Sequence, residues 1–453
     1  MSASLEGGVH PVNRAEGIYG FWVLLTERLR HGRRRGMEEQ ESMPAPPVEE
    51  SFFRRNRLIL LIFFGSLAVF ALVSADRLLR QSQAPHFVYL ADAFLHGQLD
   101  NRLPPPNDND WIRFEGKTYV SFPPLPAVLM MPFVAVFGIG FNDVLFTLPF
   151  AALNVVLMFL VLQMLSREGL SPLTRKDNLW LTAFFGFGTV HFSAAVIGEV
   201  WFTAQIVALT FTLLYILCAT RARHPFWAGL FLVLAFDARV NLAFTVGYFG
   251  LQLFFPRGAD GSFAAGSWKE IARRAAWFAL PCAVIGGLQM AMNYVRFHDV
   301  FEFGHRFLSG PAGNRIREHG LYGYHYLEWN LKALLVKLPT FSSKPPFVGY
   351  DPDGMSIFIT SPLVARLFWP KEKNWLYPIL WATLIPGILP ALFYQNSGYV
   401  QFGYRFALDV MPYVVMLLSV GRVPVTKTTK ALIIIGIIIN LAGAIAFKRS
   451  GPI

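Results

Sequence analysis

The sequence predicts an all-α polytopic membrane protein with about eleven transmembrane helices and a long first extracytoplasmic loop that carries interfacial helices. Of the 453 residues, 54% are hydrophobic and only 15% are charged, whereas a soluble protein carries roughly 25% charged residues. Apolar runs of about 20 residues, the length that crosses a bilayer, recur along the chain. Aromatic residues alone make up 15% of the chain, as is typical of lipid-facing and interfacial surfaces.

The net charge and the two cysteines argue against several classes of function. A net charge of +11 would suggest nucleic acid in a soluble protein, but basic loops beside anionic lipid explain it here, so no nucleic-acid partner is expected. Cys218 and Cys282 lie inside apolar runs, so neither a disulfide framework nor a thiolate metal site is predicted. Nucleotide chemistry and zinc hydrolysis are not indicated, because no P-loop, GxGxxG, HExxH or GxSxG pattern occurs in a fitting context.

Two parts of the chain differ in composition. Residues 1–57 are polar, with an arginine-rich segment followed by an acidic, proline-containing one, which predicts a disordered cytoplasmic tail. No cleavable signal peptide is recognised, and Met37 or Met43 is an alternative start. Residues 58–450 are expected to form one transmembrane domain, with extracytoplasmic loops at 76–142 and 295–354.

The spans follow from the apolar runs. Clear spans are expected at 58–75, 143–165, 178–197, 199–220, 275–294, 374–394, 404–421 and 429–447, and less regular ones at 225–237, 239–255 and 355–370.

Sidedness follows from the basic loops. The proline-rich segment 124–140 is predicted to lie in the outer interface, because counting it as a span would set the basic loops against the positive-inside rule. The N-terminus is then inside and the C-terminus outside. This topology brings five polar segments to the extracytoplasmic face, where any chemistry is expected: 76–142, 191–205, 237–241, 295–354 and 395–405.

The first outer loop begins with a predicted helix within residues 85–100, an amphipathic interfacial segment of about three turns. Asp92 and His96 lie on one side of it. They form either a surface pair one turn apart, or they place Asp92 over the mouth of the helix bundle as a general base.

A short hairpin is predicted next in the same loop. Glu115-Gly116 lies between two short alternating runs, which is typical of a tight β-turn. Asp108 and Asp110, just before the first run, are interpreted as turn residues.

Two spans meet at residues 186–205, where His191, Glu199 and Gln205 surround the break. Glu199 is either a plain acid at a helix N-terminus or, if buried beside Trp201, an acid or base with a raised pKa.

Arginines recur where spans meet the outer surface. Arg239 lies between two apolar runs, where a charge is costly and functional by default, with Asp237 as its expected partner. The second outer loop is unexpectedly basic. It contains Arg296, Arg306, Arg315, Arg317, Lys332, Lys337 and Lys344. Each could extend to lipid headgroups, but as a set they favour phosphate recognition.

The order of these segments resembles a known superfamily. "FVYLADAFLHGQLD", "GKTYVSFPPLPAVLMMPFVAVFG", "NYVRFHDVFEFGHR", "GYHYLEWNLKALL", "SIFITSPL" and "QFGYRFALD" follow one another as in bacterial GT-C glycosyltransferases, the relatives of protein mannosyltransferases and lipid A aminoarabinose transferases. The resemblance covers roughly 58–450 and rests on loose motifs in a shared order.

The resemblance implies a hexosyltransferase that moves a sugar from a polyprenyl-phosphate carrier to an acceptor outside the membrane, with inversion. It implies Asp92 as the catalytic base, with Asp76 second, and Arg239, Arg296 and Arg405 as phosphate ligands. Further substrate contacts are expected from His191, Glu199, His305 and Tyr404. Where relatives often carry an acid before the loop helix, this chain has Pro85.

The sequence also leads to expectations about a cofactor, the cellular location and alternative functions. The sequence indicates no definite cofactor, and Asp92 with Asp76 or Asp110 could hold a divalent cation. The expected location is a bacterial inner membrane, in contact with its lipid. The alternatives are a transporter or flippase of lipid-linked sugars, a lipid-linked polymer ligase or polymerase, and a non-catalytic membrane scaffold.

Overall fold

The computed structural model describes residues 52–257, 261–264, 266–341, 343 and 348–448. The expected tail 1–57 and the alternative starts at Met37 and Met43 therefore lie outside the described residues, apart from residues 52–57. Nearly all of the described chain belongs to one compact unit, residues 56–453, and the fold below is that of this unit.

Six helical segments of the described chain are long and apolar enough to cross a membrane, so the protein is an α-helical multi-pass membrane protein. They contain the helices α2 (Phe52–Ser74), α5 (Asp143–Arg167), α8 (Val200–Ala219), α11 (Trp268–Phe297), α15 (Leu376–Phe393) and α17 (Lys427–Ala446). All six coincide with predicted spans.

The five other predicted spans are shorter or broken helices, so a count of eleven is not confirmed. Proline and glycine account for several breaks: Gly188 ends one helix, and Pro362 and Pro412 lie in the first turns of new ones, where proline is favoured because no helical N–H bond is lost. The pieces are α6 (Arg175–Phe187), α7 (His191–Ala195), α9 (Pro225–Phe236), η5 (Val240–Val246), α10 (Gly247–Phe254), α14 (Ile357–Thr360), η8 (Pro362–Phe368), η9 (Arg405–Val410) and α16 (Met411–Val420), where η denotes a 3₁₀-helix. The further 3₁₀-helix η4 (Thr220–Ala222) ends the long segment that contains α8.

The names first and second outer loop are kept below for residues 76–142 and 295–354, whose side of the membrane stays a prediction. The first has the predicted helix and hairpin. Its elements are η2 (Ala75–Leu79), α3 (His86–Leu95), β1 (Trp111–Phe114), β2 (Lys117–Val120), α4 (Leu125–Phe137) and η3 (Gly138–Gly140). Trp111 pairs with Val120 in an antiparallel ladder. Glu115 and Gly116 both have positive φ, 48° and 74°, as a two-residue hairpin turn requires. The segment 124–140 is the short helix α4 and not a full span.

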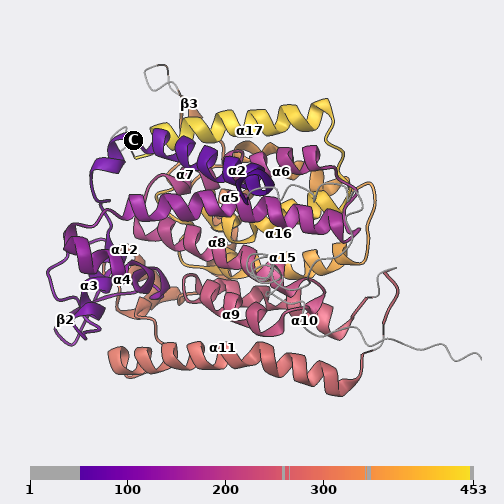
Figure 1. The fold of residues 1–453 in the computed structure, drawn as a ribbon. Helices are drawn as coiled ribbons and strands as arrows, with labels where there is room; N and C mark the ends of the chain where they lie inside the picture. Colours follow the sequence, from indigo (N-terminus) through magenta and orange to yellow (C-terminus); the bar gives the residue numbers. More distant parts are fainter. Residues whose placement is uncertain (1–51, 258–260, 265, 342, 344–347, 449–453) are drawn as a thin grey trace, which may run out of the picture. The chain divides into compact units, whose positions relative to one another are not determined.

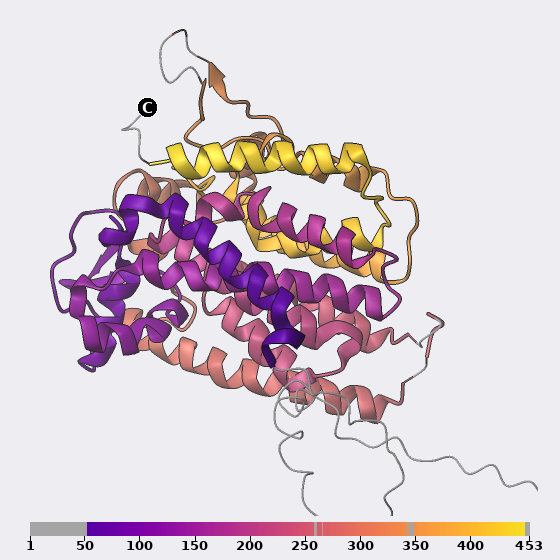
Figure 2. The same cartoon turned by 45° about the horizontal axis from the view of Figure 1, so that its top comes forward.

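The second outer loop is mostly short helices and turns. Its elements are η6 (His305–Phe307), α12 (Gly310–His319), η7 (Tyr324–Tyr326), α13 (Leu327–Leu335), β3 (Thr340–Phe341) and β4 (Val348–Gly349). In both views α3, β2, α4 and α12 gather at one end of the long helices (Figures 1 and 2).

One apolar core fixes the first outer loop to the bundle. Phe87 and Leu90 of α3, Met130 of α4, and Val200 and Val207 of α8 belong to the same buried cluster. Because α8 is the most enclosed of the six long helices, the loop rests on a rigid base. Residues 101–124, which join α3 to α4, are thereby held over the end of the bundle.

Candidate active site

A cavity opens at this end of the bundle. The empty space between its lining atoms, including the open mouth, is about 950 Å³. Its polar lining residues are Asp110, Ser121, Trp201, Arg239, Asn241, His305, Tyr322, Tyr394, Gln395, Asn396, Tyr399 and Arg405.

All five segments predicted on one side of the membrane contribute to this cavity. Asp110 comes from 76–142, Trp201 from 191–205, Arg239 from 237–241, His305 from 295–354 and Arg405 from 395–405. Segments far apart in the sequence therefore build one polar site. This is the gathering of polar residues that the topology predicts.

Asp110 supplies the carboxylate of the cavity. Its φ of 56° lies in the left-handed region, which is uncommon for any residue with a side chain and is often found at functional sites. One carboxylate oxygen accepts a hydrogen bond of 2.9 Å from Trp201 Nε1. Among the described residues no basic group lies within ion-pair distance of it. The carboxylate thus keeps acceptor capacity for a ligand.

Arg405 is a buried cation, with 7% of its surface exposed. Its guanidinium lies over the rings of Phe202 and Phe406, 5.4 and 4.9 Å from their centroids. Its Nε donates to the Gly398 carbonyl at 3.2 Å, and one terminal nitrogen lies 3.5 Å from Gln205 Oε1. In the described chain no carboxylate forms an ion pair with it. A buried cation without an anionic partner is costly, so an anionic ligand is expected here.

Arg239 lies beside Arg405 but is neutralised. Its guanidinium donates to Asp409 Oδ2 at 2.7 Å and lies over the Phe406 ring at 5.2 Å. The expected partner Asp237 was therefore wrong: Asp409, more distant in the sequence, takes that role. The same Asp409 oxygen accepts from Asn241 at 2.8 Å.

Two further residues give the cavity neutral polar groups. Burial lowers the pKa of His305 to about 4, although the nearby Asp110 carboxylate acts in the opposite sense, so its imidazole is neutral at physiological pH. Burial also raises the pKa of Tyr322, against a smaller opposing effect of Arg239, so its phenol keeps its proton.

The two predicted bases lie elsewhere. The Asp92 carboxylate is held by Arg102, whose Nε and a terminal nitrogen donate at 2.9 and 3.1 Å, and His96 lies 3.7 Å away. Asp76 forms a surface pair with Arg80 at 2.6 Å. Neither carboxylate lines the cavity. Their catalytic roles remain predictions, but Asp92 is already neutralised by a cation.

The other predicted contacts divide in the same way. Of the predicted substrate ligands, Arg239, Arg405 and His305 line the cavity and the rest do not. Arg296 is buried and donates to the Val120 carbonyl and to Asn293 Oδ1, at 3.2 and 2.9 Å. Tyr404 donates to the Ala391 carbonyl at 3.2 Å.

His191 and Glu199 lie inside the bundle. His191 Nδ1 hydrogen-bonds the Gly186 carbonyl at 3.1 Å. Glu199 is the N-cap residue of α8 and pairs with Lys448. Both are buried, and their substrate contacts remain predictions.

No cluster of three or more His, Cys, Asp or Glu side chains able to hold a metal occurs within the described ranges. Asp76 and Asp92 pair with arginines and do not line the cavity, and the divalent cation considered from the sequence stays a prediction. Asp110 is the acidic residue that lines the cavity.

Sequence reasoning missed two residues of the site. Asp110 was interpreted as a turn residue, and Asp409 was not considered, although it closes the motif "QFGYRFALD". One signal was present for each: Asp110 directly precedes a tryptophan in an acidic run, and Asp409 lies four residues after Arg405.

Comparison with known proteins gives two solved structures of membrane enzymes. The chain is similar to ArnT from Cupriavidus metallidurans bound to undecaprenyl phosphate, with 16% identity, a TM-score of 0.43, and coverage of 84% of this chain and 63% of that one. It is also similar to the oligosaccharyltransferase of Archaeoglobus fulgidus in the apo form, with 14% identity, a TM-score of 0.44, and coverage of 87% and 57%. The chain thus spans less than two thirds of either. No family model and no curated protein matches it.

Proposed function

We propose that this protein is a GT-C-type membrane glycosyltransferase that moves a sugar from a polyprenyl-phosphate carrier to an acceptor, with inversion at the anomeric carbon. The observation that carries the proposal is that two opposite charges, a guanidinium and a carboxylate, line the same cavity. Arg405 and Asp110 both line it, and among the described residues neither forms an ion pair with another side chain. The rest of the proposal follows from what each charge can do.

Arg405 is the proposed phosphate ligand. A guanidinium presents parallel N–H donors that match two phosphate oxygens. Phe202 and Phe406 fix its plane, so it need not reorganise when charge develops. Arg239 adds positive potential, but it shares its charge with Asp409. Arg405 is therefore expected to bind the phosphate directly.

Asp110 is the proposed general base. An acceptor hydroxyl attacks the anomeric carbon from the face opposite the phosphate, and the Asp110 carboxylate takes its proton. The bond between the anomeric carbon and the phosphate oxygen breaks, and the oxygen keeps the electron pair. The products are an inverted glycoside and polyprenyl phosphate with one more negative charge. Base catalysis of this kind contributes about 10²–10⁴-fold.

Arg405 acts most strongly when the phosphate leaves. The phosphate gains negative charge in the transition state, so its attraction to a fixed guanidinium increases along the reaction. Preorganised charge of this kind is worth roughly 10²–10³-fold in turnover. Neutral groups such as His305, Tyr322 and Asn241 are proposed to hydrogen-bond the sugar hydroxyls.

The proposed setting is a bacterial inner membrane and its envelope, with the N-terminus in the cytoplasm and the cavity outside. This orientation is supported by the basic loops expected on the cytoplasmic side.

The test uses the purified protein in nanodiscs with a panel of radiolabelled polyprenyl-phosphate sugars. Both transfer and release of sugar to water are measured, together with binding of undecaprenyl phosphate. Wild type is expected to cleave at least one donor. Asp110→Asn should bind donor and lose cleavage, and Arg405→Ala should lose both.

Matched controls separate the site from general damage. Asp108, two residues from Asp110, is 95% exposed and pairs only with the exposed Arg113, so Asp108→Asn should be fully active. Asp92→Asn tests the competing base. Loss of cleavage in Asp92→Asn but not in Asp110→Asn would move the base to α3. Donor binding without cleavage by wild type would instead favour a flippase or a scaffold.

A further inference from the structure

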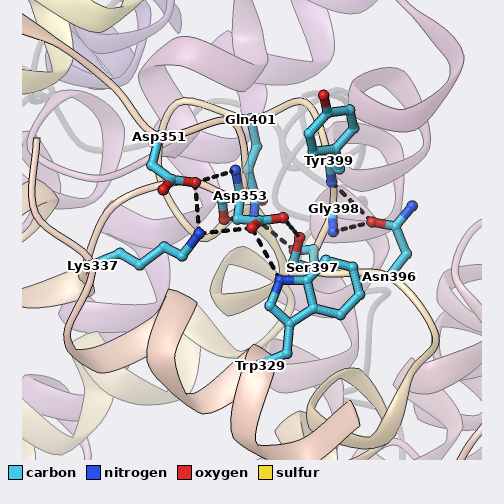
Figure 3. Close-up of polar contacts among 9 residues, drawn as sticks. All are labelled: Trp329, Lys337, Asp351, Asp353, Asn396, Ser397, Gly398, Tyr399 and Gln401. Carbon is cyan, nitrogen blue, oxygen red and sulfur yellow. Dashed lines mark hydrogen bonds and ion pairs between the residues drawn. The ribbon is translucent and has the colours of Figure 1, made fainter. Parts of the chain in front are cut away.

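A polar network lies directly behind the cavity wall. Lys337, which follows α13, extends its Nζ between two carboxylates and donates to Asp351 Oδ1 and Asp353 Oδ2, both at 2.7 Å (Figure 3). Lys337 was grouped with the phosphate-binding residues from sequence. Its charge is instead shared by two acids, and it does not line the cavity. A different role for Lys337 is needed.

Asp353 is the centre of this network. Besides Lys337, Trp329 Nε1 donates to its Oδ2 at 3.0 Å and Ser397 Oγ donates to its Oδ1 at 2.6 Å. Its side chain is 17% exposed. Both carboxylate oxygens are therefore engaged, by donors from two segments that are distant in the sequence. Such an arrangement fixes the carboxylate in one position.

The network continues from Asp353 to residues 396–401, named here the wall loop. Gln401 Nε2 donates to the backbone carbonyls of Asp353 and Ser397, both at 2.6 Å (Figure 3). The Gln401 backbone N–H donates to the Pro352 carbonyl at 3.0 Å. Gln401 and Ser397 are fully buried, so these bonds have no competition from water.

The wall loop in turn holds Arg405. Gln401 Oε1 accepts from the Arg405 backbone N–H at 2.8 Å, and the Gly398 carbonyl accepts from Arg405 Nε at 3.2 Å. The loop also gives Asn396 and Tyr399 to the cavity lining. Thus a continuous chain of hydrogen bonds runs from Lys337 through Asp353 and Gln401 to the backbone N–H of Arg405, and the Gly398 carbonyl of the same wall loop accepts from the guanidinium.

We propose that Lys337, Asp353 and Gln401 are positioning residues that fix the wall loop and thereby aim the Arg405 guanidinium at the phosphate of the donor. This inference rests on the proposed function for the identity of the anion, but not for the geometry. The network acts through Arg405 and touches no substrate itself. Its loss should reduce the attraction of the cavity for phosphate more than it reduces the stability of the fold.

The ion pair between Lys337 and Asp353 keeps its charges over a wide range of pH. Burial by itself would raise the pKa of Asp353, but hydrogen bonds from Lys337, Ser397 and Trp329 outweigh it and leave the pKa below its ordinary range. Burial would lower the pKa of Lys337, but Asp351 and Asp353 outweigh it and raise the pKa. The pair therefore stays charged across neutral pH and does not act as a switch.

The test is a double-mutant cycle between Lys337→Met and Arg405→Lys, measured as the Kd of undecaprenyl phosphate in nanodiscs. Lys337→Met is expected to weaken binding about tenfold in the wild-type background and less than about twofold in Arg405→Lys, because residues that act as a unit are not additive. Lys337→Arg, which keeps the charge, should restore binding. A merely structural role would give equal losses in both backgrounds, and that result would overturn the proposal.

A matched control comes from the same segment. Lys332 of α13 forms an exposed pair with Glu328, so Lys332→Met should leave binding unchanged. A cryo-EM structure of Lys337→Met gives a readout that needs no ligand: the wall loop and the Arg405 side chain should be displaced. An unmoved guanidinium would refute the positioning role even if wild type proved inactive. Conversely, a wild type that cleaves no donor would refute the proposed function and leave this geometry standing.

Discussion

The cavity and the network behind it contain the same kinds of charged groups, but they use them differently. In the network, Lys337 has two carboxylates at 2.7 Å, so its charge is fully engaged by partners within the protein. In the cavity, Arg405 and Asp110 form no ion pair within the described chain. The number of partners, and not the residue type, therefore separates a charge that holds the fold from a charge that awaits a ligand.

The largest effect is expected from the unpaired carboxylate. Asp110→Asn keeps the shape and the acceptor for Trp201 but cannot take a proton, so transfer should fall about 10²–10⁴-fold with donor binding retained. Initial rates of transfer and the donor Kd measure this. Asp92→Asn, which removes a carboxylate already bound by Arg102, should mainly lower the Tm. Equal losses of transfer in Asp110→Asn and Asp92→Asn would contradict the assignment of Asp110 as the base.

The unpaired guanidinium should rank second. Arg405→Ala removes the cation that stabilises the leaving phosphate, so turnover should fall roughly 10²–10³-fold, with Arg405→Lys intermediate. As a control, Arg306→Ala removes an exposed arginine that pairs with Glu302 and should change turnover little. Full activity of Arg405→Ala would show that another cation, such as Arg239, holds the phosphate.

A glycine joins the two regions and should give an intermediate effect. Gly398 has φ 104°, and an added Cβ would lie 2.6 Å from Gln401 Oε1 and 3.1 Å from Arg405 Nε. Gly398→Ala should therefore displace both side chains, at a backbone cost of about 1–3 kcal/mol. The temperature of the unfolding midpoint should fall, and the Kd of undecaprenyl phosphate should rise. Gly65→Ala is the control, because nothing lies within 4 Å of its added Cβ.

The network should affect stability over a defined pH range. Asp353→Asn should cost about 1–3 kcal/mol in the free energy of unfolding, the usual penalty for leaving a buried partner unsatisfied. Since the folded pKa of Asp353 is below its ordinary value of 3.8, its contribution is complete above that pH and is lost as the pH falls through the folded value.

The opposite holds for Lys337. Its folded pKa lies above its ordinary value of 10.5, so its contribution is complete below that pH and lost as the pH rises through the folded value. The Tm difference between wild type and Asp353→Asn should therefore be constant from about pH 5 to 9 and shrink in acid. A difference that changes between pH 6 and 8 would disprove the paired state.

The smallest effect is expected from a cavity residue without charge. Burial lowers the pKa of His305 to about 4, so its imidazole is neutral over the physiological range. The profile of kcat/KM against pH should have no inflection from His305 near its ordinary value of 6.5, and His305→Gln should keep the shape of the profile. An inflection near 6.5 that disappears in His305→Gln would show a charged imidazole in the cavity.

The sequence was sufficient for features that depend on local chemistry. The turn at Glu115-Gly116 follows from its residue types, and the six long helices follow from length and hydropathy. The gathering of the five polar segments followed from the predicted topology. The positive-inside rule places the basic loops on one side of the membrane and therefore places these five segments together on the other side. These features need no knowledge of which side chain contacts which.

The ion-pair partner of each charged side chain could not be predicted from local chemistry. Arg239 pairs with Asp409, 170 positions away, and not with the adjacent acid Asp237. Asp92 pairs with Arg102 from the loop that follows α3, and its role as a base stays a prediction. Such pairings depend on how η9 packs between the other helices, and no local pattern encodes that packing. Of the five interrupted spans, 225–237, 239–255 and 355–370 were expected to be irregular, whereas the breaks within 178–197 and 404–421 were not predicted.

The most direct measurement is a cryo-EM structure of the protein in nanodiscs with undecaprenyl phosphate. The account predicts phosphate density within hydrogen-bond distance of the Arg405 guanidinium, on the same side of the cavity as Asp110, with Lys337 still held between Asp351 and Asp353. Phosphate bound at Arg296 or at Lys337, with Arg405 unoccupied, would contradict it.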